Sequence, residues 1–219
     1  MFKKIAISTL LCNSLLLSND VLTGDTRLAC ETILCLSSST QPAECSPSLN
    51  RYFSIKFKKP SDTIDARRAF LQLCPVASGN IEDLVFKNLV VDVLPVSDPR
   101  ECTPEYLNKQ IETRTYEVYD NDGNTYLARE HRINPTLPSQ CNALFAHAYT
   151  DHKKPQYICS GAFINESAWK AGITTQSISV IEYNKLSAQE KAQYKKVGSG
   201  LKVTYQKSTP INKNCWVTQ

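Results

Sequence analysis

The chain has 219 residues, and its 25 lysines and arginines against 21 aspartates and glutamates leave a net charge of only +4, which by itself identifies no partner. Hydrophobic residues make up 42% of the sequence, but no long apolar run follows residue 17. We therefore expect no transmembrane segment in the mature chain.

The first residues have the pattern of a secretory signal peptide. Lys3 and Lys4 precede an apolar run of about 13 residues, from Ile5 to Leu17, that is too short to span a bilayer. We expect the signal peptide to occupy residues 1–24, with cleavage within 18–24, and the protein to be exported to the periplasm. Cys12 would leave with it, because the residues before Cys12 do not form a lipoprotein signal.

The remaining cysteines form an even set: Cys30, Cys35, Cys45, Cys74, Cys102, Cys141, Cys159 and Cys215. An even number of cysteines in an exported chain predicts structural disulfides, although the sequence does not give their connectivity. A zinc site would need more closely spaced cysteine pairs than this chain has. We therefore predict no metal and no other cofactor.

The first half of the chain reads as mainly helical. Amphipathic patterns predict helices over 28–36, 63–73 and 81–94. Asp62 and Asn80 are the expected N-caps of the second and third. In the first helix, Cys30 and Cys35 lie more than one turn apart, which suits bonds to other segments. The alternation of apolar residues over 53–57 predicts a strand with one buried face.

The second half mixes strands and helices. The turn sequence 120–124, Asp-Asn-Asp-Gly-Asn, predicts a hairpin that joins strands over 113–119 and 125–131. Further strands are predicted over 157–164, 178–183 and 201–205, and helices over 141–149 and 187–196. The second of these helices opens with a capping box of Ser187 and Glu190.

These elements indicate an α+β fold, a small disulfide-stapled domain with a helical N-terminal half and a mixed strand and helix C-terminal half. Prolines cluster at 95, 99 and 104, near Cys102, the first cysteine of the second half. We predict a helical region over 25–95 and an α+β region over 96–219. A single compact domain fits the same pattern.

Catalytic motifs are weak in this sequence. His147, Asp151 and His152 lie close together, but no third metal ligand accompanies them, so we expect structural roles. Glu166 sits in a segment that faintly resembles the Glu-Ser element of lytic transglycosylases, in which the glutamate is the general acid. The other elements of that family are missing here, and Glu166 reads more simply as a carboxylate at a helix start.

Basic and aromatic residues mix between Arg51 and Lys59, a composition also found in proteins that bind single-stranded nucleic acid. Because the aromatic positions fit a half-buried strand, we expect no direct contact with nucleic acid.

Four motifs in the first half occur in a distinctive order. Residues 29–36 read Ala-Cys-Glu-Thr-Ile-Leu-Cys-Leu, followed by Glu-Cys-Ser-Pro at 44–47 and Tyr-Phe-Ser-Ile at 52–55. The run 65–75, Asp-Ala-Arg-Arg-Ala-Phe-Leu-Gln-Leu-Cys-Pro, completes the pattern. Over about residues 28–76 this combination resembles the TrbM (TrbM/KikA) family of conjugal transfer proteins.

The resemblance implies a periplasmic accessory protein of a conjugative type IV secretion system, which is encoded on a plasmid and transfers DNA. It implies partners among the envelope components of that system, with a wall-remodelling lytic transglycosylase as one candidate, and it implies no enzyme activity. Tyr52, Arg67 and Arg68 are candidate partner-binding residues. Arg67 could instead pair with Glu31 or Asp65. The alternatives are a peptidoglycan-cleaving enzyme that uses Glu166, and a secreted toxin or inhibitor.

Overall fold

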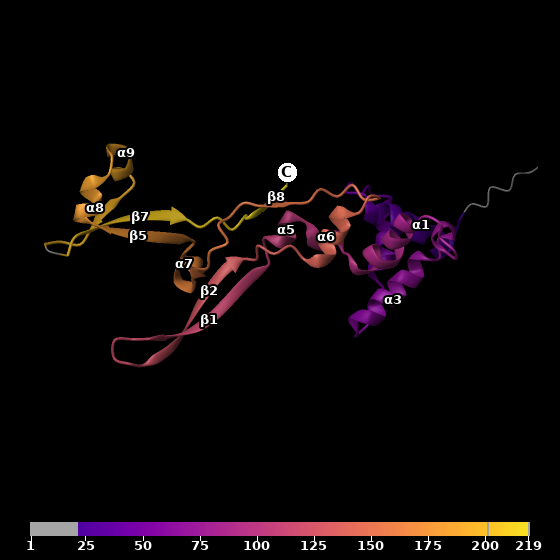
Figure 1. Cartoon of the computed structure of the whole chain (residues 1–219), viewed down its shortest axis with the longest axis horizontal. Coiled ribbons are helices and arrows are strands. Elements are labelled where there is room, and N and C mark those ends of the chain that lie inside the picture. The colour runs from indigo at the N-terminus through magenta and orange to yellow at the C-terminus, as the bar shows by residue number, and fades with distance from the viewer. Residues whose placement is uncertain (1–21, 201, 219) are drawn as a thin grey trace, which may run out of the picture.

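The computed structural model describes residues 22–200 and 202–218, and Figure 1 shows them as an elongated molecule with helices at one end and strands at the other. Most of the predicted signal peptide, residues 1–21, and with it Cys12, lies outside the described residues. No helix in the part of the chain that the structure describes is long and apolar enough to cross a membrane.

The helical end begins with three helices, α1 (Gly24–Ser37), α2 (Cys45–Phe53) and α3 (Pro60–Leu71). After a short 3-10 turn, η1 (Pro75–Ala77), the chain forms one continuous helical segment that changes its winding. It consists of α4 (Leu84–Asn88), the π-helical turn η2 (Leu89–Val93) and the 3-10 turn η3 (Leu94–Val96). We call residues 24–96 the helical unit.

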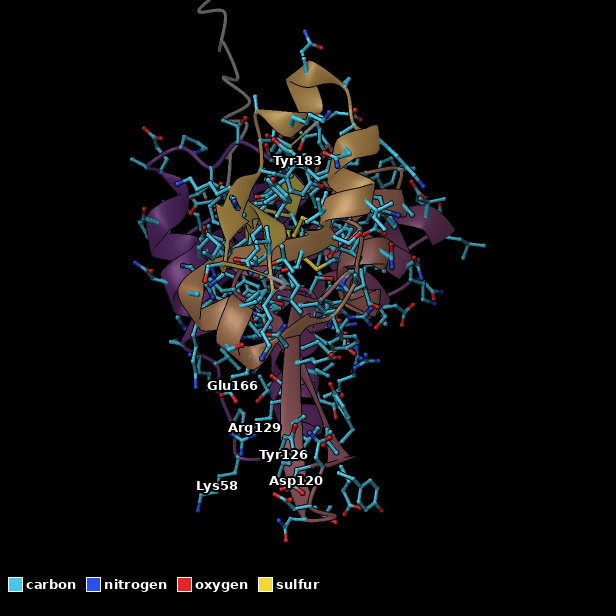
Figure 2. The ribbon with its side chains drawn as sticks, turned by 90° about the vertical axis from the view of Figure 1, so that its left-hand side faces the viewer. Lys58, Asp120, Tyr126, Arg129, Glu166 and Tyr183 are labelled. Carbon is cyan, nitrogen blue, oxygen red and sulfur yellow. A yellow bond between two sulfur atoms is a disulfide. The ribbon has the colours of Figure 1, made fainter. Side chains whose placement is uncertain are left out.

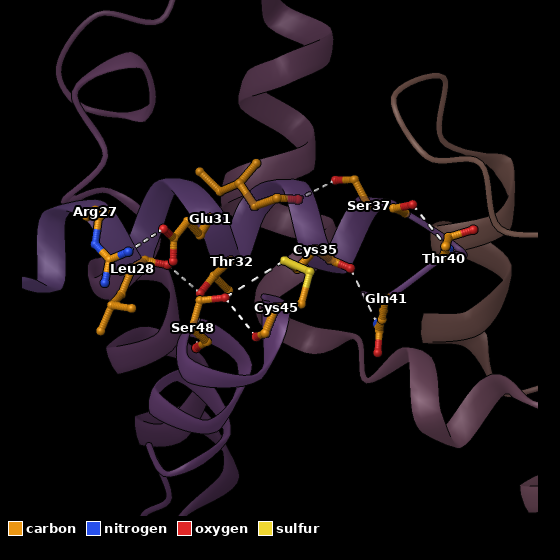
Figure 3. Close-up of a disulfide and its surroundings, with 12 residues drawn as sticks. Arg27, Leu28, Glu31, Thr32, Cys35, Ser37, Thr40, Gln41, Cys45 and Ser48 are labelled. Atoms are coloured by element: carbon orange, nitrogen blue, oxygen red, sulfur yellow. Dashed lines mark hydrogen bonds and ion pairs between the residues drawn. A yellow bond between two sulfur atoms is a disulfide. The ribbon is translucent and has the colours of Figure 1, made fainter. Parts of the chain in front are cut away.

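The helical unit has its own core, to which all three helices and η2 contribute buried apolar side chains. Buried polar contacts join α1 to α2. The hydroxyl of Thr32 lies 2.7 Å from the carbonyl oxygen of Leu28 and 3.2 Å from that of Ser48 (Figure 3). The disulfide between Cys35 and Cys45 bonds the same two helices further along. The two helices are thereby held in one arrangement.

The second half begins with η4 (Pro99–Cys102) and α5 (Pro104–Leu107), followed by the hairpin of β1 (Ile111–Tyr119) and β2 (Thr125–Ile133). The hairpin confirms the prediction and pairs in register from Ile111 with Ile133 to Tyr119 with Thr125. At its turn the Asp120 carboxylate accepts hydrogen bonds from the backbone amides of Asp122 and Asn124. Figure 1 shows the hairpin as an arm that extends away from the other elements.

The rest of the chain forms short elements, and some of them contribute to a second core. These are α6 (Ser139–Ala146), β3 (Gln156–Tyr157), β4 (Ile164–Asn165), α7 (Glu166–Ala171), β5 (Ile173–Ser179), α8 (Val180–Lys185), α9 (Ala188–Lys191), β6 (Lys195–Val197), β7 (Thr204–Pro210) and β8 (Trp216–Val217). The sheets have the orders β1-β2-β4, β3-β8 and β5-β7-β6. The second core contains both tryptophans, Trp169 and Trp216.

The two cores meet at α6. Its Leu144 is buried in the first core and its Cys141 in the second. Just after η3, the buried hydroxyl of Ser97 lies 2.7 Å from the carbonyl oxygen of Val93 and 3.2 Å from that of Gln140 in α6. The α+β fold class is as predicted, while the division at residues 95 and 96 remains a prediction.

The predicted strand over 53–57 is wrong. Phe53 is the last residue of α2, and the chain then runs as a loop in which Phe57 is 58% exposed. The helix forms because Cys45, Leu49, Tyr52 and Phe53 recur at helical spacing and are all buried on one face. The alternation of apolar residues over 53–57 is too short to specify a strand in place of this helical repeat.

Four other element assignments in the second half need correction. Residues 180–183 belong to α8 and not to a strand, because Ser179 and Glu182 form a capping box. The segment 157–164 pairs only at its two ends, in β3 and β4, since Gly161 turns the chain with φ +74° between them. Helix α9 keeps its predicted capping box but ends at Lys191, because Lys195–Val197 pairs with β7. Strand β7 begins at Thr204, and residue 201 lies outside the described residues.

Several helix ends also differ from the prediction. Helix α3 starts at Pro60, since proline is favoured in the first turn, and Asp62 lies inside it and does not cap it. Helix α4 starts at Leu84 because Asp83, not Asn80, accepts hydrogen bonds from the amides of Val85 and Phe86. Helix α6 ends at Ala146 and not at 149, and His147 leaves it to contact Val85.

Candidate functional site

All eight cysteines of the predicted even set are bonded in the structure, so none of them is a free thiol nucleophile. The pairs are Cys30–Cys74, Cys35–Cys45, Cys102–Cys141 and Cys159–Cys215. Two bridges lie in the helical unit and two in the second half, and no bridge joins the halves. As expected, Cys30 and Cys35 bond to other segments and not to each other.

Tyr52 is a core residue and not a surface contact. Its side chain is 0% exposed, and its hydroxyl donates to the carbonyl of Leu94 at 2.8 Å. Burial raises the pKa of this hydroxyl well above its ordinary value. Tyr52 therefore joins α2 to η3, and the prediction that it contacts a partner does not fit its burial.

Arg67 packs against aromatic rings and forms neither of the ion pairs considered for it. Its guanidinium carbon lies 5.0 Å from the ring centre of Tyr52 and 5.4 Å from that of Phe53. Its Nε atom is buried with no hydrogen-bond partner in the structure. On the same Phe53 ring lies the guanidinium of Arg100, at 3.5 Å. This stack of cations on aromatic rings orders the surface between α2, α3 and η4.

Arg68 connects α3 to η2. Its Nε donates to the carbonyl of Val91 at 2.8 Å, and its Nη1 lies 2.5 Å from the Asp65 carboxylate. Asp65 thus pairs with Arg68 and not with Arg67, while Glu31 pairs with Arg27. The head group of Arg68 is occupied within the fold, so a role for it in partner binding stays a prediction.

Glu166 has the environment of a helix-start carboxylate. It is the first residue of α7, and its carboxylate lies 2.7 Å from the ammonium of Lys170. The hydrogen bond to Lys170 lowers the pKa of Glu166. A general acid that protonates a leaving oxygen needs the opposite shift, so this geometry does not favour glycan cleavage by Glu166.

His147, Asp151 and His152 connect the segment after α6 to the helical unit. His152 Nε2 lies 2.8 Å from the carbonyl oxygen of Leu36, and the Asp151 amide donates to the carbonyl of Ser37. His147 Nε2 lies 3.1 Å from the carbonyl oxygen of Val85. No group of three or more metal-ligating side chains occurs within residues 22–200 and 202–218.

Two grooves open on the helical unit. The first, of about 690 Å³, lies between α1, η1 and α4 and exposes Leu34 and Val76. The second, of about 480 Å³, lies between α3 and the loop after α2 and exposes Phe57 and Leu73. Neither groove was predicted from the sequence. A signal for the second groove was nevertheless present, because the apolar residues 66, 69 and 73 lie on one face of α3 and its extension and no predicted element packs against that face.

The comparisons with known proteins identify one family. A protein-family model described as TrbM matches residues 21–183, about three quarters of the chain. No curated protein and no solved structure matches. The match contains the whole of residues 28–76 and continues through the hairpin to α8. Cys215 and Trp216, which complete the second core, lie beyond it.

Proposed function

Because this chain belongs to the TrbM family and is thereby associated with conjugal transfer, we propose that it is a periplasmic accessory of a conjugative type IV secretion system that acts by binding other proteins. One observation carries the proposal: a helical unit held by two disulfides leaves ordered apolar grooves open at its surface. A groove with ordered walls offers a partner protein a place to bury an apolar side chain.

The disulfides support the periplasmic part of the proposal. Four bridges form and persist in an oxidising compartment, whereas the cytosol keeps thiols reduced. Mass spectrometry of the unreduced protein from the periplasm tests this directly. We expect a chain that starts at about residues 19–25 and carries no free thiol. A chain that retains Met1, or free thiols, would contradict export.

The candidate partners are envelope components of the secretion system, including its lytic transglycosylase. A machine that crosses the cell wall needs its wall-cutting enzyme held at one place, and an accessory whose helical unit is fixed by two disulfides suits that task. Tagged protein, cross-linked in donor cells and purified from the periplasm, should bring down such a component. Purification of the protein alone would contradict the binding role.

A matched variant separates the binding role from the enzyme alternative. A donor that lacks the protein should regain plasmid transfer with the wild type and equally with Glu166→Gln, because Glu166 only pairs with Lys170 at the surface. Clearing of cell-wall sacculi by the wild type, abolished by Glu166→Gln, would instead favour an enzyme.

A further inference from the structure

The second groove has one wall on α3 and the other on the loop that follows α2. Ala66, Ala69, Phe70 and Leu73 line it from α3 and its C-terminal extension, and Ile55 and Phe57 line it from the loop. The paired Asp25 and Arg51 also line the groove. Phe70 is only 4% exposed, whereas Leu73 is 47% and Phe57 58% exposed. The two alanines leave space above α3, so an incoming backbone can approach this helix closely.

Phe57 is held in its exposed position by the fold. Its backbone amide donates to the Thr63 hydroxyl at 2.9 Å, which ties the loop to the first turns of α3. An aromatic side chain on a fixed backbone loses little freedom when a partner covers it, and such residues dominate binding energies. Phe57 is therefore the expected anchor point of the groove.

The loop that forms one wall of the groove is positively charged, and its Lys56 lines the groove. The loop carries Lys56, Lys58 and Lys59, all exposed, and Figure 2 shows Lys58 directed away from the molecule. The neighbouring carboxylates of Asp25 and Asp65 already pair with Arg51 and Arg68, at 2.7 and 2.5 Å. Of the acidic residues in this region, Asp62 alone forms no ion pair with any described residue, and its carboxylate accepts a hydrogen bond from the Ser61 hydroxyl. The three lysines therefore outnumber the carboxylates that form no ion pair.

We propose that this groove binds an amphipathic segment of another protein, with an apolar side chain between Phe57 and Leu73 and acidic residues opposite the three lysines. The proposal rests on the protein-binding role proposed above and specifies the chemistry of one partner. Single-stranded nucleic acid suits the groove less well, because a base-stacking surface needs several exposed aromatic faces and this groove offers only Phe57.

Peptide selection tests the charge and the place of binding together. Random peptides of about 16 residues are displayed on phage and selected on the full disulfide-bonded protein, and the enriched peptides are then synthesised with a fluorescent label. We expect them to carry a net negative charge and at least one large apolar residue. Phe57→Ser should weaken their binding by at least about tenfold, as should Lys56→Glu combined with Lys58→Glu. The effect of the lysine variant should shrink at high salt.

A matched control comes from the first groove. Leu34→Ser with Val76→Ser removes side chains that are 71% and 70% exposed and should leave the affinity unchanged. Enrichment of basic peptides, no enrichment, or equal binding to the Phe57→Ser protein would overturn the proposal. So would binding of labelled oligothymidine or of anionic vesicles in place of peptides. Any of these results would count against this groove alone. The proposed accessory function is tested separately by cross-linking to an envelope component, which would still succeed if the protein binds that component through another surface.

Discussion

The two disulfides of the helical unit allow a quantitative test of how this unit is stabilised. Cys30–Cys74 closes a sequence separation of 44 residues, and Cys35–Cys45 closes one of only 10. If a disulfide acts by restricting the unfolded chain, the longer loop contributes about 4 kcal/mol and the shorter about 3 kcal/mol at 25 °C. Replacing both cysteines of a pair with alanine keeps these positions apolar, three of which are buried and one, Cys30, partly buried.

The measurement is the free energy of unfolding in guanidinium chloride without reductant. Far-UV circular dichroism follows mainly the helices, and tryptophan fluorescence follows the second core, because both tryptophans lie there. We expect Cys30→Ala with Cys74→Ala to lower the dichroism midpoint more than Cys35→Ala with Cys45→Ala does. A larger loss for the shorter loop would refute the chain-entropy explanation for this protein.

The same experiment tests the predicted division of the chain. If residues 25–95 unfold as a separate unit, the fluorescence midpoint should stay where it is in both variants. An equal shift of both signals would mean that the two cores, which meet at Leu144 and Cys141 of α6, unfold as one cooperative domain.

Three further predictions concern single side chains. Tyr52→Phe should cost about 1 kcal/mol of unfolding free energy by chemical denaturation, since it removes a buried hydrogen bond, whereas Tyr119→Phe, 70% exposed, should cost nothing measurable. Asp83 has a pKa below its ordinary 3.8 because it accepts hydrogen bonds from Tyr149 and from two backbone amides. The ionised Asp83 therefore stabilises the folded state above about pH 4, and this contribution is lost as the pH falls through its lower, folded-state pKa. The difference in unfolding free energy between the wild type and Asp83→Asn should accordingly disappear in acid. A difference that stays constant with pH would contradict this explanation. Asp120→Ala should speed amide hydrogen exchange in β1 and β2 and leave α1 unchanged, because Asp120 holds the hairpin turn.

Local signals in the sequence were sufficient for the hairpin and for α1. The turn at 120–124 contains both the acceptor of the turn, Asp120, and a glycine with φ +81° at Gly123, and the register follows from a turn of that length. The amphipathic pattern of α1 is equally local, and the even set of cysteines comes from counting residues along the chain. The family resemblance over 28–76 also rests on local motifs, and the family model confirms it.

Local signals failed where two patterns overlap in a short segment. Phe53 belongs both to a two-residue alternation and to a helical repeat with Leu49, and only packing against the helical unit selects the helix. The segment 157–164 failed because distant strands pair only with its two ends. At 180–183 the strand prediction overlooked a local signal, the capping box of Ser179 and Glu182.

Patterns in the chain were enough to predict the α+β class, the set of eight cysteines available for pairing and the family motifs of the first half. The pairing of those cysteines, the burial of Tyr52 and the groove that Phe57 and Lys56 form with α3 emerged only from the folded structure. Pairing and burial depend on contacts between residues far apart in the chain. Periodicity and capping arise from neighbours within about one helical turn and can therefore be read directly.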